Sequence, residues 1–360
     1  MFISILIFIL TLLVLVLIHE FGHFLMAKKF GIKVEEFGFG LPPKLWGKKI
    51  GETLFSLNLI PLGGFVRLLG EDETDRKILA NSRSFASKKP WQKLLVVGAG
   101  VTMNLLLAII LFYTVIIAQN FKVISPSIDG GIYIGKLEEG LPAEKSGLKL
   151  GEKLLSIDGQ NVYTIDEARN LIKSKGEVAT TLLLQDAGGR QRSVSVTPKK
   201  VDQDILIGVY FATYFVKEYK TTTEKFFSGI TYTYDLGKLT FIGLGRTLSD
   251  AISGNLSRVS QSVAGPVGMA GITNDILSLG ARAATPYLYF VGIISLTLSI
   301  FNVLPIPALD GGRLFFILIE AVFRKKVRAD IEKIIHTVGF AVLLTLALLV
   351  TYSDINKFIR

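Results

Sequence analysis

The sequence predicts a polytopic α-helical membrane protein with about four transmembrane helices, a membrane-associated β region and an inserted extracytoplasmic α+β domain. Half of the 360 residues are hydrophobic and charged residues make up 19%, below the quarter that is usual in soluble domains. Four apolar runs are each long enough to cross a bilayer. Between the second and third runs, apolar residues alternate with polar ones over short lengths, which is typical of β-strands.

The predicted spans cover residues 1–27, 94–118, 286–323 and 334–353. The second is uncharged along its whole length. The third is expected to break at its two prolines, because proline lacks the N–H that a helix interior needs. Four spans place both ends of the chain on the same side of the membrane.

Three other segments lie between the spans. Residues 28–93 form a loop with a β region, and residues 121–220 form the inserted domain with its flanking strands. Residues 221–285 mix aromatic and small side chains with charges that oppose a spanning helix. We therefore expect an amphipathic linker helix at the membrane interface there.

The net charge of +10 is concentrated beside the apolar runs. Residues 28–93 hold 13 Lys and Arg against 7 Asp and Glu, and residues 324–333 hold 5 against 2. Cytoplasmic loops of membrane proteins carry such a basic excess. We expect both segments on the cytoplasmic side, the domain at 121–220 outside, the lipid bilayer as a partner, and no nucleic acid.

The most specific motif is His19-Glu20-Phe21-Gly22-His23, an H-E-x-x-H pattern inside the first apolar run. Residues i and i+4 share one face of a helix, so His19 and His23 can direct ring nitrogens at one metal ion. Glu20 is then placed to take a proton from water at that metal. The alternative is an interfacial helix end with two hydrogen-bonded histidines, although ionisable groups at bilayer depth are costly without a function.

A further metal ligand is expected to be a carboxylate, because the chain has no cysteine and only three histidines. Asp310 lies in the stretch N-V-L-P-I-P-A-L-D-G-G (302–312), where prolines break the helix and glycines permit a tight reversal. Two histidines and a carboxylate with an open fourth position form a catalytic zinc set. The alternative for Asp310 is to cap the following helix. His336 is expected at the membrane interface rather than on the metal.

Asn104 is a lone amide in the second apolar run, at a depth similar to that of His19. Gly98 and Gly100 precede it, and small residues let a second helix approach closely. Because an amide in lipid needs a partner, Asn104 either joins helices or contacts the substrate or metal site.

Short apolar clusters predict strands and turns in the first basic loop. They lie at residues 37–43 and 54–60 and are followed by Pro61-Leu-Gly-Gly-Phe65. Two placements are open: a β element that dips into the membrane beside the metal site, or an ordinary cytosolic hairpin.

Residues 140–159 resemble bacterial, protease-associated PDZ domains, in the pattern G-L-P-A-E-K-S-G-L followed by G-E-K-L-L-S-I-D-G. The other predicted elements of the domain are a strand at 131–137, a short amphipathic helix at 165–173, and strands at 180–185 and 192–197. PDZ domains bind peptide ends by adding a strand to a sheet edge. The resemblance therefore implies a peptide ligand, with a groove near residues 130–137.

With H-E-F-G-H in the first run and N-V-L-P-I-P-A-L-D-G-G in the third, the chain resembles the site-2 protease family of intramembrane zinc metalloproteases over essentially its whole length. The PDZ-like insert and outward N-terminus are similar to the bacterial RseP branch (regulator of sigma-E protease). Some members carry two PDZ domains in tandem, whereas this chain has room for one. The resemblance implies Zn2+ at His19, His23 and Asp310, with Glu20 as general base.

Other segments match further motifs of the family. Residues 100–104 match its G-x-x-x-N element, and N-x-x-P-x-x-x-L-D-G places Asn302 near the substrate backbone. Residues 37–41 and 62–67 are similar to its membrane-associated β region, and residues 264–268 to the segment before its third span. Asn302 and Asn104 are thus the candidate substrate-binding residues.

The resemblance implies regulated intramembrane proteolysis of single-span membrane proteins, such as anti-sigma factors or remnant signal peptides, in the bacterial cytoplasmic (inner) membrane. The active site is expected toward the cytoplasmic side, and the outer PDZ domain is expected to act as a size filter. The alternatives are a non-proteolytic zinc-binding membrane transporter or a PDZ scaffold. A transporter should show paired broken helices in two related halves, and only one break is evident. A scaffold has no use for Glu20 between two metal ligands.

Overall fold

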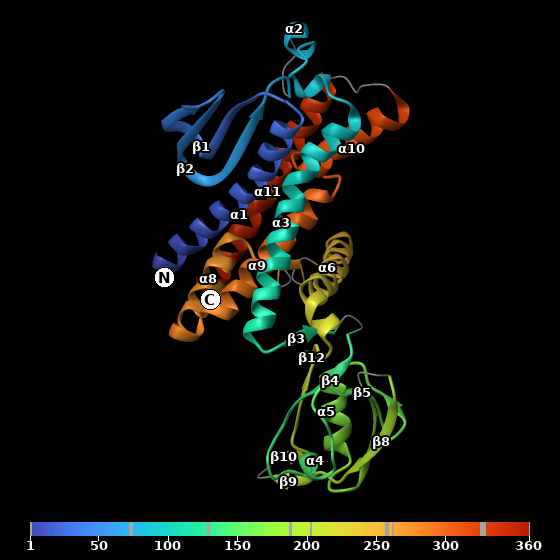
Figure 1. Ribbon diagram of the computed structural model, residues 1–360. Helices are drawn as coiled ribbons and strands as arrows, with labels where there is room; N and C mark the ends of the chain where they lie inside the picture. The colour runs from blue at the N-terminus through green and yellow to red at the C-terminus, as the bar shows by residue number, and fades with distance from the viewer. Residues whose placement is uncertain are drawn as a thin grey trace. The chain divides into compact units, whose positions relative to one another are not determined.

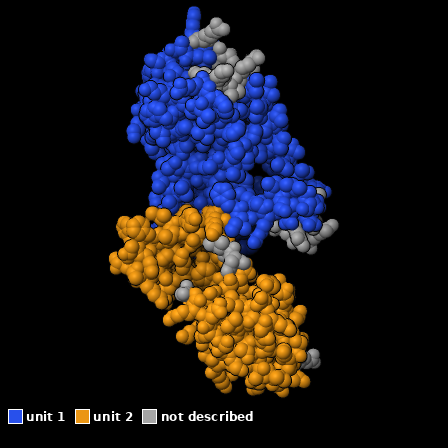
Figure 2. Space-filling view, turned by 90° about the vertical axis from the view of Figure 1, so that its right-hand side faces the viewer, with its two compact units in different colours: residues 1–115, 240–360 blue, residues 116–239 orange. Residues whose placement is uncertain are grey.

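The computed structural model describes residues 2–71, 75–127, 130–186, 189–201, 204–255, 259–260, 263–324 and 329–359, which form two compact units (Figure 2). Unit 1 combines residues 1–115 with 240–360, and unit 2 comprises residues 116–239. Three members of the second basic cluster, Lys325, Lys326 and Arg328, lie outside the described residues.

Unit 1 contains four helices that are long and apolar enough to cross a membrane. They are α1 (Phe2–Lys29), α3 (Pro90–Ala118), α9 (Ala284–Val303) and the stretch Ile331–Asn356 within α11 (Ala329–Ile359) (Figure 1). Each coincides with one predicted span. The predicted third span ends as a helix at Val303, and residues 304–309 lead without helix into α10 (Asp310–Phe323), as the two prolines require.

Hydrogen bonds tie these helices together. Ser295 and Ser299 on α9 donate to the backbone carbonyls of Asn104 and Val101 on α3, at 2.8 and 3.1 Å. The helix α8 (Pro266–Leu277) packs against α1, α9 and α11. Shorter helices are α2 (Arg76–Leu79) and the 3-10 turns η1 (Phe85–Ser87) and η2 (Gly280–Arg282).

The predicted amphipathic linker contains a long helix, α6 (Thr222–Ile252), which runs across the boundary between the units. It is not among the four helices apolar enough to span a membrane. Large apolar side chains are nevertheless exposed on it, such as Phe226 at 69% and Tyr234 at 71%. The helical part of the prediction is thus confirmed, and α8 is an additional helix in the same linker.

The β region of unit 1 is made of two long strands, β1 (Val34–Ile50) and β2 (Thr53–Leu68), that pair twice. Residues 36–39 of β1 pair with residues 54–57 on one side and with 64–67 on the other, and residues 44–50 pair with 53–58. The region therefore has four rows, in the order 64–68, 34–39, 53–60 and 44–50. The row 64–68 is an edge among the described residues.

Aromatic side chains hold this β region against α1. The ring of Phe24 on α1 lies 5.6 Å from that of Phe37 and 6.0 Å from that of Phe55. At the turn between the strands, the carboxylate of Glu52 accepts hydrogen bonds from Arg83 at 2.6 Å and from Lys28 at 2.7 Å. These bonds lower the pKa of Glu52 to about 2, so the carboxylate is charged when it ties the turn to the end of α1.

Unit 2 contains a six-stranded sheet in the order β11-β4-β5-β7-β8, with β6 paired to β5. Its strands are β4 (Ile132–Leu137), β5 (Lys153–Ile157), β6 (Gln160–Asn161), β7 (Thr180–Gln185), β8 (Gln191–Val196) and β11 (Val209–Ala212). Two smaller ladders pair β3 (Lys122–Pro126) with β12 (Tyr214–Glu218) and β9 (Lys199–Val201) with β10 (Asp204–Leu206). The strands predicted at 131–137, 180–185 and 192–197 are confirmed.

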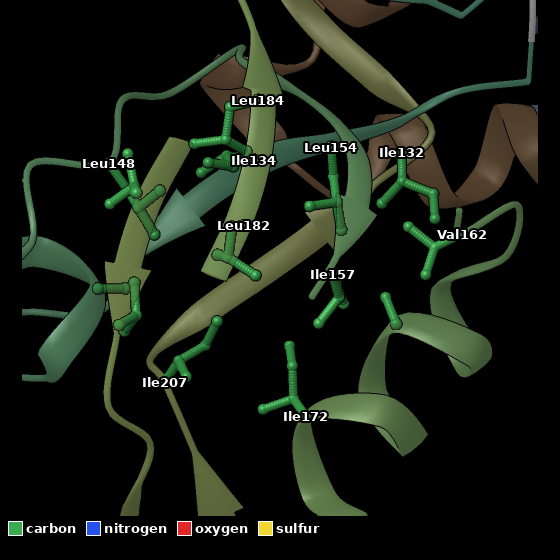
Figure 3. Close-up of a cluster of buried hydrophobic side chains, with 14 residues drawn as sticks. Ile132, Ile134, Leu148, Leu154, Ile157, Val162, Ile172, Leu182, Leu184 and Ile207 are labelled. Carbon is green, nitrogen blue, oxygen red and sulfur yellow. The ribbon is translucent and has the colours of Figure 1, made fainter. Parts of the chain in front are cut away.

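Two helices, α4 (Pro142–Lys145) and α5 (Ile165–Ser174), complete the predicted elements of unit 2. Thr164 and Glu167 form a capping box that starts α5, since each side chain accepts from the other residue's backbone N–H. Fourteen buried side chains form the core between strands and helices, and Leu154, Leu182 and Leu184 are among them (Figure 3). Unit 2 therefore has a contiguous hydrophobic core of its own.

The expected groove at residues 130–137 is wrong. The strand β4 at this position is interior, with β11 on one side and β5 on the other. Among the described strands the sheet ends in β11 on one side and in β8 on the other, and β11, which covers β4, comes about 75 residues later in the chain. Sequence alternation predicts a strand but not which neighbours will pair with it, and here the late strand covers the early one.

Candidate active site

Three side chains from two distant helices converge inside unit 1. His19 Nε2 lies 3.2 Å from His23 Nε2 and 2.9 Å from Asp310 Oδ2, and His23 Nε2 lies 3.2 Å from the same oxygen. Ligand atoms on a tetrahedral zinc ion with bonds of about 2.0–2.2 Å would be separated by roughly 3.3–3.6 Å. The three groups therefore already have nearly the spacing of one metal coordination sphere.

The chemistry of the three atoms fits a cation at their centre. His23 Nδ1 lies 2.9 Å from the carbonyl oxygen of Val96, so Nδ1 carries the proton and donates it, which leaves the Nε2 lone pair facing inward. Asp310 Oδ2 is buried and makes no hydrogen bond among the described residues. Lone pairs at this separation repel one another unless a cation lies between them. The set is the only group of three or more His, Asp or Glu in metal-binding proximity within the part of the chain that the structure describes.

Gly100 on α3 makes room for the two histidine rings. A Cβ atom at this position would lie 2.7 Å from His23 Cε1 and 2.8 Å from His19 Cε1. No side chain fits there without moving the rings, because carbon atoms pack at about 3.5–4.0 Å. The first residue of the predicted G-x-x-x-N element therefore forms one wall of the site.

Asp310 owes its position to the break between α9 and α10. It is the first residue of α10, and Gly311 and Gly312 follow it in buried positions. A Cβ atom on Gly311 would lie 2.7 Å from the carbonyl carbon of Val303, and one on Gly312 would lie 2.7 Å from the carbonyl oxygen of Ile306. Only glycine allows the chain to fold back this closely, which directs the carboxylate toward α1.

Glu20 lines the same space. A cavity of about 350 Å³ opens beside the three converging groups, and residues of α1, β2, α3 and α10 form its wall. They are Glu20, His23, Phe65, Val66, Arg67, Leu68, Glu71, Val96, Val97, Asp310 and Arg313. The cavity reaches the carboxylate that the H-E-x-x-H motif predicts as the base.

The edge row of the β region runs along this cavity. Phe65, Val66, Arg67 and Leu68 all line it. A Cβ atom on Gly64 would lie 3.5 Å from Glu20 Cγ and 3.4 Å from Leu17 Cδ2, so the row passes directly over the first helix. The predicted β element thus lies beside the candidate metal site.

The two predicted asparagines do not line the cavity. Asn104 is 1% exposed on α3, four residues beyond Gly100, and its Oδ1 atom is buried without a hydrogen-bond partner among the described residues. Asn302 is half-buried in the last turn of α9. His336, predicted away from the metal, lies on α11 and accepts a hydrogen bond at its Nδ1 from the Ala308 N–H at 2.9 Å.

An ion pair that the sequence did not indicate lies in the wall of the cavity. Arg313 on α10 donates a hydrogen bond to Glu71, which follows β2, and both side chains line the cavity wall. The two residues are more than 240 positions apart in the chain, so no local pattern connects them. Arg313 follows the D-G-G triplet directly, and that adjacency was the one available signal.

The family model "Peptidase family M50" matches residues 7–346 of the chain. The chain is 36% identical to a protein of Clostridium perfringens whose name places it among the zinc metalloproteases, over 95% of each sequence. It is 31% identical to zinc metalloprotease RasP of Geobacillus kaustophilus, over 99% of this chain and 98% of that one.

Among solved structures, a PDZ domain of an SdrC-like protein from Listeria innocua matches 22% of this chain and 92% of that chain. The sequence identity is 24% and the TM-score is 0.21.

Proposed function

The chain belongs to peptidase family M50, the site-2 protease family, and is a multi-pass intramembrane zinc metalloprotease. From this premise we propose that His19, His23 and Asp310 hold its zinc ion and that Glu20 is its catalytic base. The observation that carries the proposal is the convergence of three lone pairs within 3.2 Å beside a cavity that Glu20 lines. Two histidines and one carboxylate leave a fourth position open for water or substrate, as in catalytic zinc sites.

The chain's own residues then divide the reaction between them. A zinc ion at this site supplies Lewis-acid polarisation of the scissile carbonyl and makes water more acidic. Glu20 takes the proton of the attacking water and passes it to the leaving amine. Val96 fixes the tautomer of His23, and the close packing at Gly100 fixes the position of both rings.

We propose that substrate is held as an added strand on the edge row 64–68. A peptide bond inside a helix is shielded by its i→i−4 hydrogen bonds, so the substrate must be unwound before hydrolysis. An edge row offers the unpaired N–H and C=O groups that an extended segment needs. This row lines the cavity and passes over Glu20, so a segment paired to it lies beside the base.

Asn104 and Asn302 are proposed to contact the extended substrate where it continues beyond the cavity, which neither side chain lines. The buried Oδ1 of Asn104 lacks a partner among the described residues. A donor that reaches such a buried amide oxygen forms a stabilising hydrogen bond. Asn302 lies directly before the loop that presents Asp310. Substrate backbone N–H groups are the donors that both positions suit.

We propose single-span membrane proteins, such as anti-sigma factors or remnant signal peptides, as the substrates. The basic segments at 28–93 and 324–333 favour a cytoplasmic location for these loops, in a bacterial inner membrane, and an outer location for unit 2. We further propose that unit 2 is a PDZ domain that limits access and binds a peptide end at the β11 edge, where Val209 and Phe211 are half-buried and Tyr210 is 52% exposed.

The test compares purified wild-type protein with Glu20→Gln in two measurements: zinc bound per chain, and cleavage of a model single-span substrate. Zinc retained in both proteins, with cleavage in the wild type alone, is the expected result. Glu139→Gln is the matched control, because Glu139 is exposed in unit 2 and the same chemical change there should leave both readouts unchanged.

Two outcomes contradict the proposal. If Glu20→Gln cleaves at the wild-type rate, Glu20 is not the base. If His19→Ala and Asp310→Ala each retain one zinc per chain, the metal lies elsewhere. In either case the assignment of site residues fails, although membership of the family does not depend on it.

A further inference from the structure

The loop between α9 and α10 is held by a side chain from another helix. Residues 305–309 contain two prolines, so only Ile306, Ala308 and Leu309 have a backbone N–H to satisfy. Ile306 and Leu309 donate to carbonyls of the loop itself, at 2.6 and 3.2 Å. Ala308 N–H instead donates to Nδ1 of His336 on α11, at 2.9 Å.

Ala308 is in a conformation that alanine does not favour. Its φ angle is +75°, in the left-handed region, where a Cβ atom is crowded by the neighbouring backbone. Residues persist there only when their surroundings hold them. The bond to His336 is one such restraint, and it acts two residues before Asp310.

His336 also contacts the chain on the other side of Asp310. The position of a Cβ atom on Gly312 lies 3.2 Å from His336 Cε1, and the ring of Phe316 on α10 lies 5.8 Å from the imidazole ring. One turn further along α11, a Cβ atom on Gly339 would lie 2.9 Å from the carbonyl of Pro307. The helix α11 therefore packs closely against the chain both before and after Asp310.

We infer that His336 is a positioning residue, which sets the place of the Asp310 carboxylate by accepting the Ala308 N–H and packing on Gly312. This inference rests on the proposed function, because it takes Asp310 as a zinc ligand. His336 holds no metal itself: its role is to keep a strained loop in the single conformation that presents the carboxylate. Partners that orient metal ligands change metal affinity or activity by about 10–100-fold when they are removed.

The test uses the full chain with His336→Phe and His336→Asn. Phenylalanine keeps an aromatic ring against Phe316 but has no acceptor, whereas the Asn Oδ1 lies about where His Nδ1 lies. Zinc release to a chromogenic chelator and the separate values of kcat and KM are measured. His336→Phe should release zinc about tenfold faster and lower kcat with little change in KM, while His336→Asn stays near the wild type.

Thr337→Ala is the matched control, because Thr337 is the next residue on α11, is exposed and bonds only to Lys333 of its own helix among the described residues. It should behave as the wild type. If His336→Phe does not fold, His336→Gln replaces it, since Gln carries its oxygen one bond further out and cannot reach the Ala308 N–H in the same pose.

The inference is overturned if His336→Phe, or His336→Gln in its place, releases zinc at the wild-type rate. It is also overturned if His336→Asn is as impaired as His336→Phe, because ring packing alone would then explain both. An Asp310→Ala variant separates this failure from that of the proposed function. If Asp310→Ala loses its zinc but the His336 variants hold zinc as the wild type does, the inference alone is rejected. If Asp310→Ala retains its zinc, the proposed metal site itself is rejected.

Discussion

A methyl group added at Gly100 should disable the active site without unfolding the protein. Gly100 is a helix residue on α3, and alanine is a better helix former than glycine by about 0.5–1 kcal/mol. Local propensity therefore favours Gly100→Ala. The cost arises only across the helix interface, where the new Cβ atom would lie 2.7 Å from His23 Cε1 and 2.8 Å from His19 Cε1.

The size of the effect follows from this overlap. Nonbonded carbons separate to about 3.5–4.0 Å, so the rings or the helices must retreat by roughly 1 Å. Overpacking of this kind costs about 1–3 kcal/mol of stability. A displacement of about 1 Å at reacting groups costs on the order of 100-fold in rate. We expect Gly100→Ala to weaken zinc binding about 10–100-fold and to lower kcat/KM by at least about 100-fold.

Gly98→Ala is the matched control on the same helix. No heavy atom lies within 4 Å of the Cβ position at Gly98, so this variant receives the same methyl group in open space. Zinc per chain after dialysis against a chelator, thermal melting and cleavage of a single-span substrate are measured for both. If the zinc content and the cleavage rate of Gly100→Ala both lie within about twofold of those of Gly98→Ala, the methyl group does not displace the histidine rings. A twofold difference is too small for a displaced ligand.

Three further predictions concern the metal and unit 2. Asp310→Asn should lose its zinc. Chelator treatment should then lower the melting temperature of the wild type but not of this variant, because a bound metal stabilises only the state that holds it. Equal responses of the two proteins to chelator would contradict this. Leu184 is 0% exposed, so Leu184→Ala should destabilise unit 2 by about 2–5 kcal/mol. The measurement is hydrogen-exchange protection of β5 and β7, which should fall. Unchanged protection would show that the core is not packed as described. Burial opposes ionisation of Glu152, but hydrogen bonds from Arg192 and from the Lys149 N–H outweigh it and hold the pKa of Glu152 below its usual 4.5. The charged carboxylate thus stabilises unit 2 above pH 4.5, and this contribution is lost as the pH falls through the lowered pKa. Glu152→Gln should therefore reduce protection of β5 and β8 at neutral pH and lessen the further loss in acid; an acid loss as large as in the wild type would contradict this.

Local signals were sufficient for the four long apolar helices and for the candidate metal ligands. A run of apolar residues specifies a spanning helix because the bilayer requires both apolar side chains and satisfied backbone groups. The i, i+4 spacing of His19 and His23 specifies a shared face because it depends only on the helix repeat. Asp310 could be predicted because two prolines and two glycines around it leave few conformations for the chain.

Contacts between distant segments decided everything else. The row 64–68 lies beside Glu20, Gly100 faces the histidine rings, and His336 holds the Ala308 N–H, across separations of 28 to about 80 residues. Likewise β11 rather than β4 lies at that edge of the sheet in unit 2. A sequence pattern shows which face of a helix or strand is apolar, but strand register and helix packing select the partner on that face. The chain by itself determined the chemistry of the site, and the tertiary structure determined what surrounds that chemistry and holds it in place.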